Sequence, residues 1–288
     1  MTERSGVLID AESLHRLRAS EPALILLDVR WALGDPDGRA HYRAGHLPGA
    51  VYVDLETELA GPGGAGRGRH PLPELGDLQE AARSWGIRPG SPVVAYDDVG
   101  CLSAARAWWL LRWAGLPSVR LLDGGLGAWR RAGYGLESTP PADAARPTPR
   151  GDVTLSPGAL AVLGAEDSAT LARSGLLLDA RAPERYRGEL EPVDPRAGHV
   201  PGAVSAPTAA NLRPDGTFLE ASELARRFAA LGAGSAEAIG AYCGSGITAA
   251  HEIAALTIAG FEAALYPGSW SEWVSDPDRP VAVGEARG

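Results

Sequence analysis

The sequence predicts an α/β protein of two similar domains, each a parallel β-sheet flanked by helices. Three observations predict this class: a length of 288 residues, an internal repeat, and strand-length apolar runs that alternate with helical patterns. A chain of this length can bury two cores of ordinary size. Hydrophobic residues make up 45% of the chain and charged residues 22%, which is typical of a globular protein that folds unaided.

The same motifs occur twice in the same order. The first half contains LILLDVR (24–30), HYRAGHLPGAVYVD (41–54), SPVVAYDD (91–98) and LLDGGLGAW (121–129). The second half contains GLLLDAR (175–181), RAGHVPGAVSAP (196–207), EAIGAYCG (237–244) and ALYPGSWSEW (264–273). Between them, 137–152 is rich in Pro and Ala without apolar periodicity and predicts a linker. We therefore expect a first domain over 1–136 and a second over 153–288.

Each copy alternates strands with helices. The apolar runs in 24–30, 91–98, 175–181 and 237–244 have the length of buried strands. Helices are predicted over 73–86 and 220–232, where apolar residues recur every three or four positions and the pattern stops at a glycine. A third helix is predicted over 248–260, which ends at Gly260. This alternation predicts parallel sheets covered on both faces, with the ligand site beyond the carboxyl ends of the strands.

The composition excludes several classes of function. A formal net charge of −9 gives no basic field for nucleic acid or for an anionic membrane surface. No apolar run has the length of a membrane span, and the first twenty residues lack the apolar core of a secretory signal, so we expect a cytoplasmic protein. The two cysteines, Cys101 and Cys243, have no partner spacing for a disulfide or zinc site. We expect neither metal nor cofactor.

Cys243 stands where a predicted strand meets a predicted helix. Gly244, Ser245, Gly246 and Ile247 must turn the chain tightly between them. Glycines permit positive φ values, which direct backbone N–H groups inward, and the start of a helix adds its own N–H groups. Such a cradle stabilises a thiolate, so the pattern predicts a nucleophilic cysteine. The alternative is a small buried side chain that ends a strand.

The first copy has an aspartate at the equivalent point. Alignment of Ala95-Tyr96 with Ala241-Tyr242 places Asp97 opposite Cys243. Because a carboxylate cannot act as a sulfur nucleophile, we expect the first domain to be catalytically inactive. Cys101 lies near the start of the following helix, where packing is the expected role.

These residues carry a family resemblance. The duplicated Asp-x-Arg, the duplicated Gly-His-(Leu/Val)-Pro-Gly-Ala and the Cys243 loop resemble the tandem rhodanese sulfurtransferases from about Leu24 to the end of the chain. The loop CGSGIT is similar to that of the 3-mercaptopyruvate sulfurtransferases, whereas thiosulfate-using members typically carry basic residues after the cysteine. The resemblance implies two rhodanese-like domains and sulfur transfer from a small anionic donor. It also implies that a persulfide forms on Cys243 and passes its sulfur to cyanide or to a thiol acceptor such as thioredoxin.

The resemblance also implies a set of site residues. Donor binding falls to Arg185 and Arg196 and to the loop residues Gly244, Gly246, Ile247 and Thr248. A proton relay falls to Ser245, His70 and Glu56, with Asp54 as the other candidate for the acid. Either arginine could instead be a solvated surface residue or part of a structural ion pair.

Three other functions fit parts of the pattern. Some protein phosphatases share this fold but need an arginine six positions after the cysteine to hold phosphate, and Ala249 occupies that position. A rhodanese module that only binds partners is a second alternative, although such modules typically lack the cysteine. Thiosulfate remains the alternative donor.

Overall fold

The computed structural model describes residues 3–35, 37–64, 66–138 and 149–288, which fold into two compact units. The first unit comprises the described residues of Met1–Gly61, Pro73–Ala159 and Arg213–Phe218, and the second those of Pro62–Leu72, Leu160–Leu212 and Leu219–Gly288. Most of the predicted linker, residues 139–148, lies outside the described residues. Two short segments, 62–72 and 213–218, belong to a different unit from the residues on either side of them. The repeat did not indicate this exchange.

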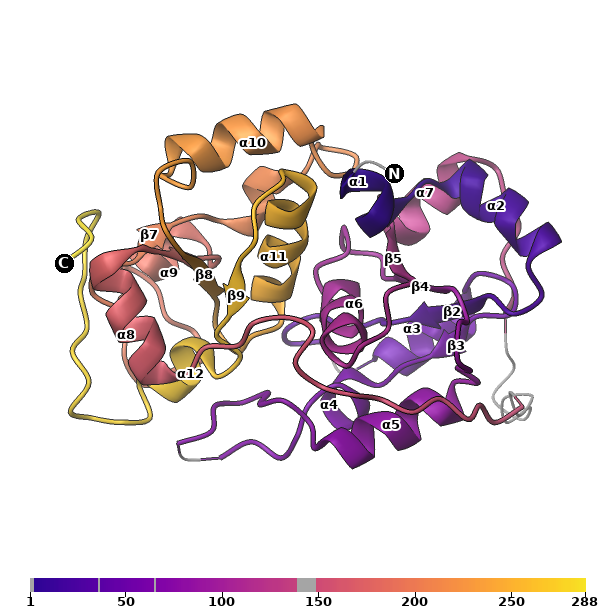
Figure 1. Cartoon of the computed structure of the whole chain (residues 1–288), viewed down its shortest axis with the longest axis horizontal. Coiled ribbons are helices and arrows are strands. Elements are labelled where there is room, and N and C mark those ends of the chain that lie inside the picture. The colour runs from indigo at the N-terminus through magenta and orange to yellow at the C-terminus, as the bar shows by residue number, and fades with distance from the viewer. Residues whose placement is uncertain (1–2, 36, 65, 139–148) are drawn as a thin grey trace. The chain divides into compact units, whose positions relative to one another are not determined.

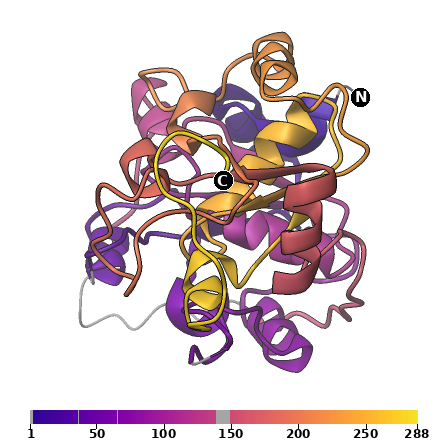
Figure 2. The ribbon, with the colours of Figure 1, turned by 90° about the vertical axis from the view of Figure 1, so that its left-hand side faces the viewer.

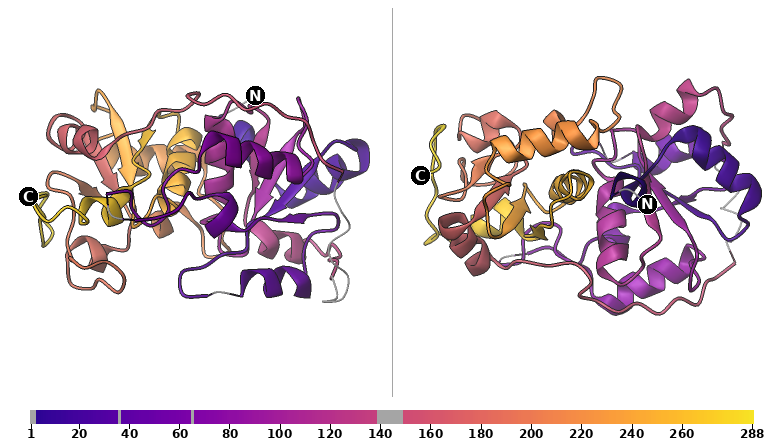
Figure 3. Two further views of the ribbon diagram at one scale, coloured as in Figure 1. Left: turned by 90° about the horizontal axis from the view of Figure 1, so that it is seen from below. Right: turned by 45° about the horizontal axis from the view of Figure 1, so that its top comes forward.

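The first unit contains a five-stranded parallel sheet in the order β1-β5-β4-β2-β3. Its elements are α1 (Glu3–Val7), β1 (Leu8–Ile9), α2 (Ala11–Ser20), β2 (Ile25–Asp28), α3 (Gly38–Ala44), β3 (Val51–Tyr52), α4 (Leu55–Glu58), α5 (Leu75–Ser84), β4 (Val93–Tyr96), α6 (Ala104–Trp113), β5 (Val119–Leu122) and α7 (Gly125–Arg131). Leu14 of α2 and Trp129 of α7 share a core with Leu26 and Val94 on one face of the sheet. Helix α6 packs on β4 and β5 from the other face (Figure 3).

The second unit contains a four-stranded parallel sheet in the order β7-β6-β8-β9. Its elements are α8 (Ala165–Ser174), β6 (Leu176–Asp179), α9 (Pro183–Tyr186), β7 (Val204–Ser205), the 3₁₀ helix η1 (Thr208–Asn211), α10 (Ala221–Ala230), β8 (Ile239–Tyr242), α11 (Thr248–Ile258), β9 (Ala264–Leu265) and α12 (Ser269–Trp273). Val162 bridges to Leu265 in parallel, at the place that β1 takes in the first sheet.

Helices cover both faces of the second sheet. Leu171 of α8 and Trp270 of α12 share a core with Tyr242 of β8, while α11 packs on β8, β9 and α10 (Figures 1 and 2). All four residues of β8 are buried, as expected for a strand with helices on either side. The predicted fold class is confirmed, and the three predicted helices are α5, α10 and α11. None of the helices in the described part of the chain is long and apolar enough to cross a membrane.

The Gly-His-Pro-Gly turns have the same contacts in both units. His46 Nδ1 is 2.8 Å from the Tyr42 carbonyl and stacks on the Tyr42 ring, and His199 Nδ1 is 2.8 Å from the Tyr186 carbonyl and stacks on that ring. The same contacts occur in the unit that contains Cys243 and in the unit that has Asp97 at the equivalent position. Both turns therefore serve the fold.

Helix α11 carries a buried carboxyl group, Glu252. Asn211 Nδ2 donates to Glu252 at 2.7 Å, and Arg227 lies 3.4 Å from it. Burial raises the pKa of Glu252 from 4.5 to about 7, with Arg227 opposing the rise. Between those two pH values the folded protein keeps a proton that the unfolded chain has released. Raising the pH through this range therefore favours unfolding.

We expect the free energy of unfolding to fall by roughly 3 kcal/mol from this group as the pH rises from 4.5 to 7. Glu252→Gln removes the titrating group, so its melting temperature should fall less over that range than that of the wild type. Thermal melts at a series of pH values check this. Glu262→Gln, at an exposed residue, is the matched control. Parallel curves for wild type and Glu252→Gln would contradict the prediction.

Candidate active site

Cys243 directly follows β8 and begins the turn that leads into α11. Its side chain is buried, and the Gly246 N–H donates to Cys243 Sγ at 3.1 Å. Gly246 has φ +79°, and a Cβ there would collide with the Pro267 carbonyl oxygen and lie 2.9 Å from Pro267 Cα. A glycine is therefore required at 246 both for backbone conformation and for space. The turn directs an amide at the sulfur, as the sequence predicted.

Gly244 serves a different purpose from the one predicted. Its φ is not among the positive values of this chain, so conformational freedom does not explain it. A Cβ at Gly244 would instead lie 3.2 Å from Arg69 Nη2 and 3.4 Å from Arg185 Nη1. The missing side chain lets two guanidinium groups approach the residue next to Cys243.

The turn before α12 holds the backbone of the cysteine. The Cys243 N–H donates to Ser269 Oγ at 3.1 Å, and the Trp270 N–H donates to the Cys243 carbonyl at 3.0 Å. Ser269 has φ +54°, which is uncommon for a residue with a side chain. Its hydroxyl also donates to the Tyr266 carbonyl at 2.8 Å. Ser269 was not predicted as part of the site, although the repeat aligns it with Gly125, which has the same φ of +54°.

The loop 62–72 belongs to the second unit and brings a histidine to the cysteine turn. The Arg69 N–H donates to Ser271 Oγ at 3.1 Å, and the Gly66 N–H donates to Ser275 Oγ at 3.2 Å. A hydrogen bond of 2.8 Å then joins His70 Nδ1 to Ser245 Oγ, with both residues buried. The structure therefore brings together two of the three predicted relay residues.

The third predicted relay residue, Glu56, lies in the first unit. It is part of α4, where its carboxylate accepts from Trp31 Nε1 at 2.7 Å. Asp54, the other candidate for the acid, is the N-cap of α4 and accepts from the Glu56 and Thr57 N–H groups. Both acids thus have hydrogen-bond partners within their own unit.

The predicted arginines have different surroundings. Arg185, at the end of α9, contacts Glu191 at 2.6 Å and lies beside Gly244. The Arg196 guanidinium donates to the carbonyls of Pro277 and Arg279, at 3.4 and 3.0 Å. The Arg196 guanidinium is therefore hydrogen-bonded to backbone carbonyls, while Arg185 lies next to the cysteine turn.

Arg69 was not predicted and lies beside the same glycine as Arg185. It forms an ion pair with Asp194, whose other carboxylate oxygen is 3.4 Å from Arg185 Nη2. Burial raises the pKa of Asp194, and the Arg69 guanidinium opposes that rise by favouring the ionised form. Only its place next to His70 in GRGRH could have indicated Arg69.

Ile247 and Thr248 complete the turn. Ile247 is buried and precedes the helix, and Thr248 is the half-buried first residue of α11. Among the residues that the structure describes, no group of three or more His, Cys, Asp or Glu side chains could hold a metal ion. The chemistry available at this turn is that of a sulfur nucleophile with an amide donor, a Ser–His pair and two arginines.

Comparison with known proteins agrees with this geometry. The model of the rhodanese-like domain matches residues 10–132 and 164–276. The chain belongs to the rhodanese sulfurtransferase family. Among its relatives, the probable 3-mercaptopyruvate sulfurtransferase of Pseudomonas aeruginosa is 49% identical over 98% of this chain and 99% of its own length. The putative thiosulfate sulfurtransferase SseB of Mycobacterium tuberculosis is 48% identical over 99% of this chain and 100% of its own.

A solved structure supports the same family. The 3-mercaptopyruvate sulfurtransferase SseA of Escherichia coli superimposes with a TM-score of 0.79 at 31% identity, covering 92% of this chain and 98% of its own. The prediction of two rhodanese-like domains is confirmed by the two matched ranges.

The first rhodanese-like domain has a different group in the equivalent turn. The Asp97 carboxylate accepts four backbone hydrogen bonds of 2.8 to 2.9 Å, from the N–H groups of Val99, Cys101, Ser103 and Ala104. Cys101 is buried, and its thiol donates to the Leu122 carbonyl at 3.0 Å. Burial raises the pKa of the Cys101 thiol well above its usual value, and the nearby Asp97 adds to this effect. In the first domain, therefore, the Asp97 carboxylate accepts the hydrogen bonds that the backbone amides of this turn donate.

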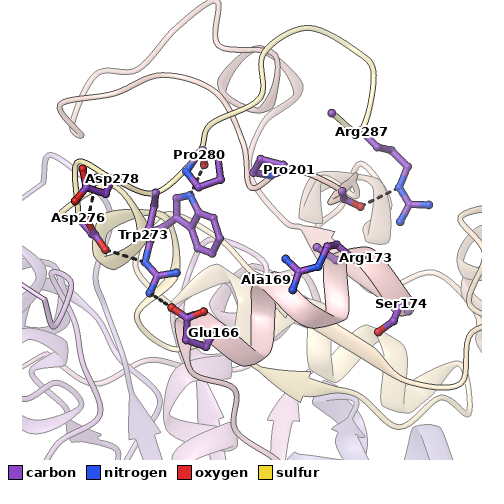
Figure 4. A pocket seen from close by; sticks show the side chains of 15 residues that line it. Glu166, Ala169, Arg173, Ser174, Pro201, Trp273, Asp276, Asp278, Pro280 and Arg287 are labelled. Atoms are coloured by element: carbon purple, nitrogen blue, oxygen red, sulfur yellow. Dashed lines mark hydrogen bonds and ion pairs between the residues drawn. The ribbon is translucent and has the colours of Figure 1, made fainter.

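A pocket of about 910 Å³ lies elsewhere in the second rhodanese-like domain, against α8 and the C-terminal segment (Figure 4). Its lining residues do not include Cys243. Arg279 in this pocket pairs with Glu166 at 2.7 Å and lies over the Trp273 ring, and Arg287 Nε donates to the Gly202 carbonyl at 2.9 Å. These contacts attach the C-terminal segment to the domain.

Proposed function

We propose that this protein transfers sulfur from 3-mercaptopyruvate, through a persulfide on Cys243, to a thiol or cyanide acceptor. The observation that carries the proposal is the Gly246 N–H directed at Cys243 Sγ. The turn from 244 to 249 contains no basic residue, and Arg185 stands beside Gly244. This arrangement suits a donor whose anionic carboxylate is held away from the sulfur that reacts.

The proposed first step moves one sulfur atom. The Cys243 thiolate attacks the donor sulfur, an S–S bond forms, and the C–S bond breaks. The electron pair of that bond passes to the adjacent carbon as the enolate of pyruvate, which then takes a proton. The products are the Cys243 persulfide and pyruvate. An amide at the sulfur stabilises the anionic form both before and after transfer.

Ser245 and His70 are proposed to handle that proton. Their hydrogen bond of 2.8 Å places a hydroxyl and an imidazole next to the cysteine turn. Through this pair a proton can pass between the donor thiol and the enolate carbon. We propose Glu56, whose carboxylate accepts a hydrogen bond from Trp31 Nε1, as the acid of this relay.

The second step and the cellular setting are also proposals. A thiol such as that of thioredoxin attacks the outer sulfur of the persulfide and restores the Cys243 thiolate. The first domain is proposed to be catalytically inactive, because Asp97 occupies its turn. Both cysteines are free thiols, which suits a reducing cytoplasm. The net charge of −9 disfavours nucleic acid and anionic membranes as partners.

Thiosulfate is the second candidate donor, since one relative at 48% identity carries the name of a putative thiosulfate sulfurtransferase. With thiosulfate, the Cys243 thiolate attacks the outer sulfur and sulfite leaves with the electron pair of the S–S bond.

Mass spectrometry of the protein after incubation with each donor tests the proposal. We expect one added sulfur on Cys243 with 3-mercaptopyruvate, formed faster than with thiosulfate. Faster formation with thiosulfate would make that donor the correct one. No added sulfur with either donor would refute sulfur transfer and leave a partner-binding module as the remaining explanation.

A further inference from the structure

Two arginines of the large pocket in the second domain have no acidic partner. The pocket, of about 910 Å³, is lined by Arg173 in the last turn of α8 and by Arg287 in the C-terminal segment. Arg173 Nη2 donates to Thr170 Oγ1 at 3.4 Å, and Arg287 Nε donates to the Gly202 carbonyl at 2.9 Å. Within the described part of the chain, neither guanidinium forms an ion pair. Both side chains therefore keep terminal N–H groups that a ligand can use.

Gly202 brings these two arginines to the same place. Its N–H donates to the Arg287 carbonyl, in addition to the bond that its own carbonyl accepts. A Cβ at Gly202 would lie 2.5 Å from the carbonyl oxygen of Ala172, the residue before Arg173. Because Gly202 has φ +89°, glycine is required there both for conformation and for this close approach. Figure 4 shows both arginines at one end of the pocket.

The acids of the pocket lie at its other end, around a third arginine. Arg279 Nη2 pairs with Glu166 at 2.7 Å, and its Nε lies 3.6 Å from Asp276. Asp278 also lines this end of the pocket (Figure 4). Positive and negative charges are thus separated across the pocket, so an anion is attracted only to the end with Arg173 and Arg287.

This arrangement fits a compact dianion that is attached to a larger organic group. One guanidinium fork satisfies the two oxygens of a carboxylate, whereas two guanidinium groups can share the three terminal oxygens of a phosphate monoester. Such a phosphate carries close to two negative charges at neutral pH, which matches the two arginines. The pocket is larger than a phosphate needs and has the size of ordinary small-molecule sites. Ala169, Pro201 and Pro280 line it as apolar residues.

We propose that this pocket binds a small organic phosphate, and that Arg173 and Arg287 hold its phosphate group. The residues that line the pocket do not include Cys243. The site is therefore separate from the cysteine turn, and the proposal does not depend on sulfur transfer.

The main test measures the Kd of phenyl phosphate by calorimetry at neutral pH. We expect a Kd of about 1 mM or tighter for the wild type, because two charge-assisted hydrogen bonds contribute. Arg173→Gln and Arg287→Gln should each weaken the Kd by about 10-fold or more. Arg226→Gln, at an exposed residue of α10 that does not line the pocket, is the matched control and should change the Kd by less than about twofold.

Absence of binding to the wild type would overturn the proposal. An unchanged Kd in Arg173→Gln, which alters only an exposed side chain, would overturn it as well. A loss in Arg287→Gln alone would show that Arg287 acts through its contact with Gly202 and that the two arginines do not share a ligand.

A second comparison tests the charge of the ligand. Phenyl sulfate has nearly the shape of phenyl phosphate but carries one negative charge, and phenol carries none. We expect phenyl phosphate to bind about threefold or more tighter than phenyl sulfate, and phenol to bind most weakly. Equal Kd values for the phosphate and the sulfate would show that the pocket does not select a dianion, and the proposed ligand class would be wrong.

A third comparison decides where the ligand binds. Arg185→Gln changes the cysteine turn and leaves the pocket intact, so its Kd for phenyl phosphate should equal that of the wild type. Arg173→Gln should form the Cys243 persulfide at the wild-type rate. If Arg185→Gln lost binding while Arg173→Gln kept it, phenyl phosphate would bind at the cysteine turn and the proposal would fail. A wild type that binds phenyl phosphate but transfers no sulfur would support the pocket and refute only the proposed function.

Discussion

Replacing Cys243 with serine is expected to abolish persulfide formation and to reduce kcat for sulfur transfer by at least about 10⁴-fold, as removal of a nucleophile does. Serine keeps the size of the side chain but is not ionised at neutral pH, so the Gly246 amide has no sulfur anion to stabilise. Steady-state rates and the mass of the protein after incubation with donor measure the effect.

Cys101→Ser is the matched control for that experiment. Cys101 is buried in the first domain, and its thiol donates to a backbone carbonyl, so its loss should change stability more than turnover. We expect kcat within about twofold of the wild type. If Cys101→Ser abolished transfer while Cys243→Ser retained it, the assignment of the catalytic domain would be reversed.

Gly246→Ala should reduce kcat/KM by about 10²-fold or more, as loss of a single oxyanion-type donor does. Gly246 has φ +79°, and an added Cβ would meet the carbonyl oxygen and Cα of Pro267. Because backbone cannot give way as a flexible side chain can, the turn must shift and carry its N–H away from Cys243 Sγ. Sulfur-transfer rates and thermal melts of the purified variant measure this.

Gly260→Ala separates conformational strain from the close approach. Gly260 also has a positive φ, +86°, but no atom lies within 4 Å of the position of its Cβ. This variant should lose about 1–2 kcal/mol of stability, the cost of the left-handed region for a residue with a side chain. Its rate should remain close to that of the wild type. Equal rates for the two variants would mean that the Gly246 turn does not support the chemistry.

Local patterns were sufficient to predict the fold and the nucleophile candidate. Buried strands, helices that end at glycines and the repeated motifs are encoded within a few residues of one another. They led to two parallel sheets, and they located the turn of Cys243 and its twin at Asp97. The carboxylate of Asp97 in the first turn is directly visible in the sequence, because the repeat aligns it with the cysteine.

Long-range packing explains what the sequence left open. The segments 62–72 and 213–218 fold with the opposite halves of the repeat, which no periodicity records. Periodicity reports which face of an element is buried and does not report which distant loop lies against it.

The sequence by itself determined the family-level architecture and the position of the Cys243 turn. Only the tertiary structure decided the partners of that turn. It brings His70 into a hydrogen bond with Ser245, and it lets the Ser269 hydroxyl accept from the Cys243 N–H. It also places Arg69 beside Gly244, whereas the Arg196 guanidinium is hydrogen-bonded to backbone carbonyls. The physical reason is that a turn is specified by the conformations of its own residues, whereas charged side chains are placed by contacts between segments far apart in the chain.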